Sequence, residues 1–135
     1  MDKLTTIFQR DPYAQLLRME LVRCEPGYAM TRVTITDDML NFHGTANGGL
    51  IFSLADYAFA AASNAYGQTA VGINTHMSYH AAGKVGDVLT CAAHEVKRSR
   101  RLAVYDMRTI NAKGELVSTM EGTVYIKNER VTGET

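Results

Sequence analysis

The chain has 135 residues, with 14 basic and 14 acidic side chains that give a formal net charge of zero. This length predicts one domain covering residues 1–135, and the neutral balance argues against nucleic acid or an anionic membrane as the main partner. The two cysteines, Cys24 and Cys91, lack metal-site or redox spacing, and the first residues lack the apolar core of a signal peptide. No apolar run is long enough to span a bilayer. We therefore expect a reduced cytoplasmic protein without a membrane segment.

The N-terminal part predicts a short helical segment followed by two strands. Apolar positions within residues 1–18 favour a helix that breaks or restarts at Asp11-Pro12, because proline cannot continue a helical hydrogen-bond ladder. Residues 19–24 can extend into a strand, and alternating side chains at 28–36 indicate a half-buried strand. The turn between them, residues 25–27, has proline and glycine where a type II turn needs them.

A long helix is predicted at residues 48–64, after a loop at 37–46. Asn47 is a suitable N-cap and Gly67 a suitable terminator, because asparagine favours helix starts and glycine favours helix ends. The helix is apolar on nearly every side, so we expect it to be buried.

Four further strands are predicted, and together they indicate an α+β fold. Their ranges are 69–80, 87–98, 102–110 and 116–127. Each is rich in β-branched, aromatic or other apolar residues, and the short connections between them suit antiparallel hairpins. Strands in series leave no crossover helix for a parallel sheet. We therefore expect one long helix packed on about six antiparallel strands, ending in a polar tail at 128–135.

Asp56 is the only formally charged residue between Met39 and Gly83. A lone carboxylate in an apolar helix is costly to bury, and aspartate has a poor helix propensity. One interpretation is that Asp56 faces solvent or pairs with a distant arginine. The other is that it serves as a general base or nucleophile in a partly desolvated cleft. Burial raises the pKa of such a carboxyl and nearby donors lower it, and the sequence leaves both effects open.

Two glycines begin the predicted helix, where backbone N–H groups have no partner within the helix. Without side chains at Gly48 and Gly49, a ligand oxygen can approach these N–H groups, and the helix dipole adds partial positive charge. Such a terminus can polarise a carbonyl group and stabilise an oxyanion. Asn41, a few residues upstream, is a candidate for a second donor. Alternatively, the glycines only allow the loop to turn tightly into the helix.

The spacing between Gly48 and Asp56 predicts how the two groups can cooperate. Eight residues separate them, which is roughly 12 Å along a helix that rises ~1.5 Å per residue. One carbonyl carbon cannot contact both groups of the same helix. If both act on one carbonyl, they come from different protomers, and two antiparallel central helices in a two-fold dimer provide this arrangement twice. The catalytic hypothesis therefore predicts an obligate dimer with shared sites.

The run from Asn41 through Gly48 to Asp56 resembles the signature of PaaI-type acyl-CoA thioesterases of the hotdog superfamily. The similarity covers roughly residues 12–127. It implies a hotdog fold, with a central helix wrapped by a curved antiparallel sheet, and homodimers that pair into homotetramers. It also implies hydrolysis of phenylacetyl-type, other aryl or fatty acyl-CoA esters to free acid and CoA. By position, the Gly48 amide and Asn41 would polarise the thioester carbonyl, and the partner's Asp56 would attack it or activate water.

The chain departs from this family pattern at two places. The family usually has histidine before the Gly-Gly pair, and this chain has Asn47. Asn47 can still cap the helix and, with Gly49, border the substrate, but any role of that histidine in orienting the loop is missing. Residues 79–82 read Tyr-His-Ala-Ala, where relatives usually have an arginine. This change can alter the CoA contacts or the choice of substrate.

Four cations lie within five residues at a predicted hairpin: Lys97, Arg98, Arg100 and Arg101. Arginine forks match phosphate geometry, so one interpretation is a site for the phosphates of CoA. The other is an ordinary solvated turn. We retain Arg98, Arg100 and Arg101 as candidates for substrate binding.

His43 and Asn74 complete the candidate site, and two further histidines are weighed as metal ligands. His43 can line the pocket or act as an alternative base, or it can be an exposed loop residue. Asn74 can orient Asp56 or a water molecule, or it can be a polar strand residue. His76 and His80 share a strand face but have no carboxylate or third ligand nearby in the sequence. We therefore expect no metal site, and no cofactor other than the coenzyme A of the substrate.

Two rival functions stay open at this point. A hotdog hydratase or dehydratase needs a histidine–carboxylate pair for proton transfer, and His43 with Asp56 is the only obvious option. A non-catalytic acyl-CoA binding module is the second rival, and Asn47 in place of histidine favours it. Neither a nucleophile elbow nor a cysteine-led triad is visible, which disfavours serine or cysteine acyl transfer.

Overall fold

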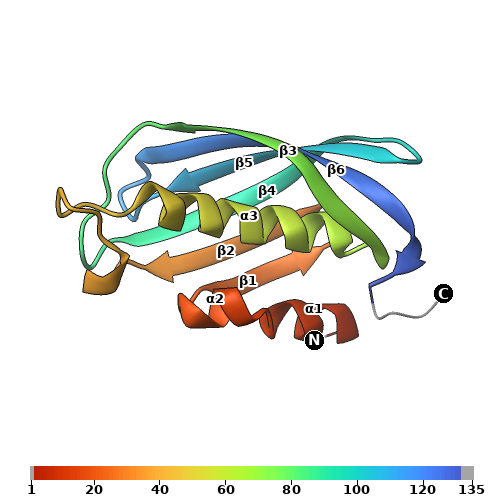
Figure 1. Ribbon diagram of the computed structural model, residues 1–135, viewed down its shortest axis with the longest axis horizontal. Helices are drawn as coiled ribbons and strands as arrows, with labels where there is room; N and C mark the ends of the chain where they lie inside the picture. Colours follow the sequence, from red (N-terminus) through yellow and green to blue (C-terminus); the bar gives the residue numbers. More distant parts are fainter. Residues whose placement is uncertain (1, 132–135) are drawn as a thin grey trace.

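The computed structural model describes residues 2–131, in which an antiparallel six-stranded sheet curves around one long helix (Figure 1). The strand order is β1-β2-β4-β5-β6-β3. This arrangement confirms the predicted α+β class and the central helix. The elements are α1 (Lys3–Gln9), α2 (Pro12–Leu16), β1 (Glu20–Glu25), β2 (Tyr28–Thr34), the short 3-10 helix η1 (Asp37–Met39), α3 (Gly48–Asn64), β3 (Gln68–Tyr79), β4 (Val88–Arg98), β5 (Leu102–Ile110) and β6 (Leu116–Arg130).

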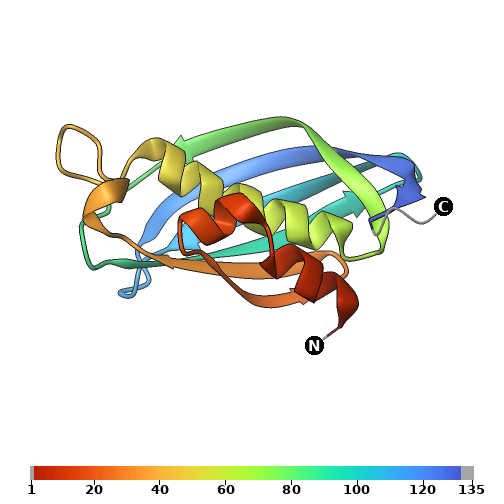
Figure 2. The same ribbon diagram turned by 60° about the horizontal axis from the view of Figure 1, so that its bottom comes forward.

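The N-terminal helical segment breaks at Asp11-Pro12 as predicted, giving α1 and α2. The Asp11 carboxylate caps α2 by accepting hydrogen bonds from the backbone of Tyr13 and Ala14, at 3.0 and 3.2 Å. The segment is fastened to α3, where the Tyr57 hydroxyl donates to the Phe8 carbonyl at 2.8 Å. Figure 2 shows the two short helices beside α3 on the β1 side of the sheet.

Helix α3 begins at Gly48 and ends at Asn64, as predicted. The Asn47 side chain caps its start, and after its end the Gly67 N–H donates to the Asn64 carbonyl at 3.0 Å. The prediction that this helix is buried is wrong for one of its faces. Gly49, Asp56 and Ala60 are exposed along it, because the sheet covers only one side of the helix and α2 covers only part of the other.

The predicted hairpins form between β4 and β5 and between β5 and β6, but not between β3 and β4. Strand β3 instead pairs with β6 at one edge of the sheet, while β4 lies between β2 and β5. The connection at 80–87 therefore crosses the end of the sheet and packs beneath the loop before α3. There the Ala46 N–H donates to the Gly83 carbonyl at 2.8 Å. A Cβ on Gly83 would lie 2.7 Å from the Ile35 side chain, so glycine at this position allows the connection to pack closely against Ile35.

Two features at the ends of the sheet complete the fold. Strand β6 continues to Arg130, into the segment that the sequence predicted as a polar tail, and residues 132–135 lie outside the described residues. None of the helices within residues 2–131 is both long and apolar enough to cross a membrane.

Phe59 shows how closely α3 approaches the sheet. Its ring is 2% exposed and makes an edge contact with Tyr105, at 5.8 Å between ring centroids. Beneath it lie two strand glycines, Gly72 in β3 and Gly122 in β6. A Cβ on Gly122 would lie 2.7 Å from the ring and one on Gly72 would lie 3.2 Å away. The absence of side chains at these two positions therefore sets the height of the helix above β3 and β6.

Substituting Gly122 with alanine should lower the free energy of unfolding by about 1–3 kcal/mol, because the new methyl group overlaps the Phe59 ring. Gly72→Ala should cost less, since its methyl group has more room. Urea denaturation measures both values. Adding Phe59→Leu to Gly122→Ala should recover part of the loss. An equal cost of the alanine with and without the Phe59 ring would contradict this contact.

Candidate active site

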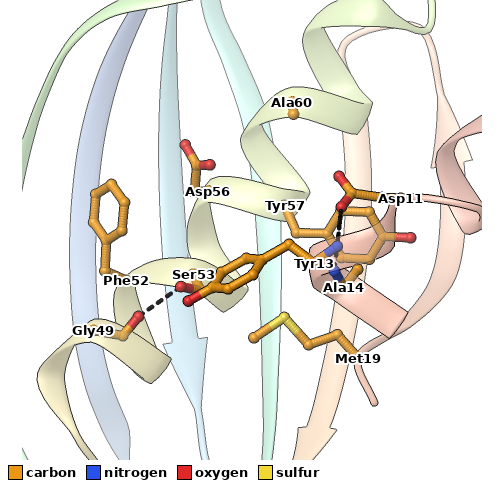
Figure 3. A pocket seen from close by; sticks show the side chains of 10 residues that line it. All are labelled: Asp11, Tyr13, Ala14, Met19, Gly49, Phe52, Ser53, Asp56, Tyr57 and Ala60. Atoms are coloured by element: carbon orange, nitrogen blue, oxygen red, sulfur yellow. Dashed lines mark hydrogen bonds between the residues drawn. The ribbon is translucent and has the colours of Figure 1, made fainter. Parts of the chain in front are cut away.

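A cavity of about 510 Å³ opens between the exposed face of α3 and helix α2 (Figure 3). It brings together two of the predicted site residues, Asp56 and Gly49, with side chains from the N-terminal segment that the sequence analysis did not select. The residues that line it are Asp11, Tyr13, Ala14, Met19, Gly49, Phe52, Ser53, Asp56, Tyr57 and Ala60.

The Asp56 carboxylate has no hydrogen bond or ion pair with any group of residues 2–131. Its side chain is exposed in the single chain, as one interpretation of the sequence expected, but the arginine partner of that interpretation is missing. Desolvation by the surrounding atoms raises the pKa of the Asp56 carboxyl, and the negative charge of Asp11 raises it further. Of the two opposing effects named above, burial and nearby donors, burial therefore dominates, and the pKa of Asp56 is raised.

The start of α3 leaves one backbone donor free. The Asn47 side chain accepts from the Gly49 N–H at 2.7 Å, and the Asn47 carbonyl accepts from Leu50 and Ile51 at 2.9 and 3.3 Å. The Gly48 N–H has no partner within the described part of the chain. Capping by Asn47 thus uses up the other N–H groups of the first turn and leaves the Gly48 N–H available to a ligand oxygen.

Asn41 organises the loop that leads into this helix start. Its side-chain oxygen accepts from the His43 N–H at 2.9 Å and from the N–H and hydroxyl of Thr45 at 3.2 and 3.3 Å. The loop is closed by the Asn47 N–H, which donates to the Met39 carbonyl at 2.8 Å. The Asn41 amide nitrogen has no partner in the described residues, so it remains a possible donor. The sequence predicted that donor but missed the acceptor role, which asparagine commonly takes in turns.

The cationic hairpin is largely engaged with its own chain. Arg98 lies over the Tyr66 ring, 3.7 Å from its centroid, and donates to the Gln68 side chain at 3.4 Å. Arg101 donates to the Ile126 carbonyl at 3.4 Å and to the side chain of the nearby Asn128 at 3.1 Å. Arg100 is exposed and makes no such contact within residues 2–131.

The other candidates lie outside the cavity of the single chain. His43 is exposed, and its ring packs on the ring of Phe42 with 4.1 Å between centroids. Asn74 is exposed on edge strand β3, where it pairs in register with Thr123. His80 contacts the Thr119 hydroxyl at 2.9 Å. Within residues 2–131 no group of three or more His, Cys, Asp or Glu residues is arranged to hold a metal ion.

Comparison with known proteins identifies the family. The family described as Thioesterase superfamily matches residues 43–118. The acyl-coenzyme A thioesterase PaaI of Escherichia coli is 32% identical over 128 residues, covering 95% of this chain and 91% of that protein. The structure of E. coli PaaI, from the phenylacetic acid degradation operon, superposes with a TM-score of 0.90 at 30% identity and covers 93% of this chain and 91% of that one. A thioesterase structure from Streptococcus pneumoniae with coenzyme A has a TM-score of 0.79 at 27% identity, covering 83% and 90%.

The chain belongs to the thioesterase superfamily. Its sheet wrapped around one central helix is the hotdog fold of PaaI-type members, as the sequence signature predicted. It is accordingly an enzyme of the thioester hydrolase class.

Replacing Asp11 by asparagine should lower the pKa of Asp56, because the substitution removes a negative charge from the same cavity. Asparagine caps helices as well as aspartate does, so α2 should persist. The side-chain carboxyl carbon of Asp56, followed by NMR through an acid titration, reports this pKa. Asp2→Asn is the matched control, since the Asp2 side chain caps α1 in the same way but does not line the cavity beside Asp56. An unchanged or raised Asp56 pKa in Asp11→Asn would contradict the electrostatic coupling.

Proposed function

We propose that this chain is an acyl-CoA thioesterase that hydrolyses aryl (phenylacetyl-type) or fatty acyl-CoA to free acid and CoA. The observation that carries the proposal is an unpaired carboxylate, Asp56, at a mostly apolar cavity on a helix whose first N–H is free. Membership of the thioesterase superfamily supports the reaction class. The names of the E. coli relative and of the coenzyme A complex support CoA esters as the substrates.

The active form is a dimer with shared sites. Strand β3 is an edge strand with exposed apolar residues, Val71 at 41% and Ile73 at 55%. An exposed edge with unpaired backbone groups favours pairing with another strand. Antiparallel pairing of two β3 strands would satisfy these groups and set two α3 helices antiparallel beside each other. The exposed faces of α3 would then meet, and pairing of such dimers would give the tetramer implied by the family resemblance.

In this dimer the Gly48 N–H and the Asn41 amide of one protomer donate to the thioester carbonyl oxygen. Asp56 of the second protomer either removes a proton from the attacking water or attacks the carbonyl carbon itself. In the first case the water oxygen bonds to the carbonyl carbon, the carbon–sulfur bond breaks, and the CoA thiolate receives a proton. If Asp56 attacks, its oxygen bonds to the carbonyl carbon, the CoA thiolate leaves and takes up a proton, and water then hydrolyses the mixed anhydride to the free acid and the Asp56 carboxylate. The donors stabilise the negative charge that develops on the carbonyl oxygen. The scheme needs no metal and no cofactor beyond the CoA of the substrate.

The remaining candidates border this centre. Asn47 and Gly49 shape the helix start, and His43 and Asn74 approach the shared crevice from the loop and from β3. Of the three arginines, Arg100 is the most available for the CoA phosphates, because Arg98 and Arg101 already contact their own chain.

Asp56→Asn and Asp56→Ala should each lower kcat/KM for acyl-CoA hydrolysis by about 10²–10⁴-fold, because the base or nucleophile is lost. Gly48→Pro should cost about 10²–10³-fold, since proline removes the N–H but fits the first position of a helix. Release of free thiol from aryl and fatty acyl-CoA esters is the measurement.

Gly48→Ala is the matched control, because it keeps the N–H and its Cβ would meet Tyr79 at an ordinary 3.5 Å. It should lose far less activity than Gly48→Pro, and equal losses would remove the amide from the mechanism. Full activity in both Asp56 variants would remove the carboxylate. Tight binding of acyl-CoA without thiol release would favour the non-catalytic module, and a changed enoyl absorbance without thiol release would favour the hydratase.

Ile73→Lys should convert the dimer into a monomer and abolish thiol release, because a charge on the edge strand opposes pairing and the site is shared. Light scattering after size-exclusion chromatography gives the mass. Ile110→Lys is the control, since Ile110 is an apolar strand residue of similar exposure, 41%, on β5 rather than on the edge strand. A fully active Ile73→Lys monomer would exclude shared sites.

A further inference from the structure

The cavity beside Asp56 is chemically suited to an acyl group rather than to the nucleotide end of CoA. Its described lining includes two carboxylates, Asp11 and Asp56, and no lysine, arginine or histidine. The phosphates of CoA carry several negative charges and are repelled from such a place. Most of the remaining surface is apolar or aromatic, from Tyr13, Ala14, Met19, Phe52, Tyr57 and Ala60.

We propose that Asp11 makes this cavity selective for neutral acyl groups, so that acyl-CoA esters whose acyl group bears a free carboxylate are poor substrates. The inference rests on the proposed function and deepens it, because it defines the class of acyl group that is accepted. It also identifies a residue outside the reacting centre that decides this choice.

The position of the Asp11 carboxylate is fixed by the fold. The carboxylate accepts the two backbone hydrogen bonds from Tyr13 and Ala14 that cap α2, and the Ala14 side chain is buried. Asp11 therefore cannot swing away from the cavity without uncapping α2. Figure 3 shows Asp11 at the start of α2 and Asp56 on α3, among the residues that line the cavity.

An acyl chain that reaches into the cavity from a thioester held near Asp56 extends toward Asp11. A neutral chain meets the apolar lining and gains from its burial. A terminal carboxylate would lie between two negative charges with no cation in the lining to balance it. Like charges within one cavity, with part of the solvent excluded, disfavour binding by about tenfold or more.

The experiment compares esters that differ only in a terminal carboxylate: hexanoyl-CoA with adipoyl-CoA, and phenylacetyl-CoA with carboxyphenylacetyl-CoA. Thiol release at neutral pH gives kcat and KM for the wild type, Asp11→Asn and the control Asp2→Asn. The wild type should prefer the neutral member of each pair by about tenfold or more. Asp11→Asn should reduce this preference about five- to tenfold, mainly through a lower KM for the anionic ester. Asp2→Asn should keep the wild-type preference.

The possible failures are distinguishable. Equal kcat/KM for the two members of each pair in the wild type overturns the selectivity and leaves the thioesterase activity intact. A preference that Asp11→Asn does not change, or that Asp2→Asn changes equally, shows that Asp11 does not set it and also overturns the inference. Absence of thiol release from all four esters overturns the proposed function and the inference with it.

Discussion

The separation between a free backbone N–H and an unpaired carboxylate on one helix is the constraint on which the functional interpretation depends. Gly48 and Asp56 belong to the same continuous helix, α3, so their spacing of roughly 12 Å follows from helical rise and cannot shrink while the helix stays intact. The close contact of Phe59 with Gly72 and Gly122 holds that helix against the sheet. If both groups act on one carbonyl, as we propose, a second copy of the chain must supply one of them.

The start of α3 shows how asparagine can serve where relatives usually have histidine. The Asn47 side chain and carbonyl satisfy three N–H groups of the first turn, which leaves the Gly48 N–H as the one donor still available in that turn. Asn41 holds the preceding loop through its side-chain oxygen and keeps its amide nitrogen free. The orientation of the helix start is therefore supplied by two asparagines acting as acceptors, without a ring at position 47.

Sequence patterns predicted the helix and strand bounds, which depend on interactions between residues close together in the chain. Asn47 as the N-cap, Gly67 as the terminator and the apolar periodicity between them predicted both ends of α3 to the residue. Alternation of apolar and polar residues predicted each strand to within a few residues. The pairing of β3 with β6 could not be predicted from the length of the connection between β3 and β4. Gly83 in that connection suggested a hairpin turn, whereas in the structure it allows the connection to pack closely against Ile35. The sequence likewise did not predict that Asp11 lines the cavity, because an aspartate directly before a helix is already explained by its role as an N-cap. The sequence suggested Arg98 as a phosphate ligand, because it does not reveal that the Tyr66 ring lies beneath the guanidinium group.

The pKa of Asp56 shows how its charge affects the stability of the folded chain. Its pKa is raised in the folded chain, so the fold binds the proton more tightly than the unfolded chain does. Below the unfolded pKa both states are protonated and Asp56 has no effect on stability. As the pH rises through the folded pKa, the ionised carboxylate destabilises the fold. At neutral pH the chain therefore keeps a destabilising charge on an otherwise apolar helix, where alanine would be better for stability. The hydrolytic role that we propose for Asp56 would account for a destabilising charge at this position beside the cavity.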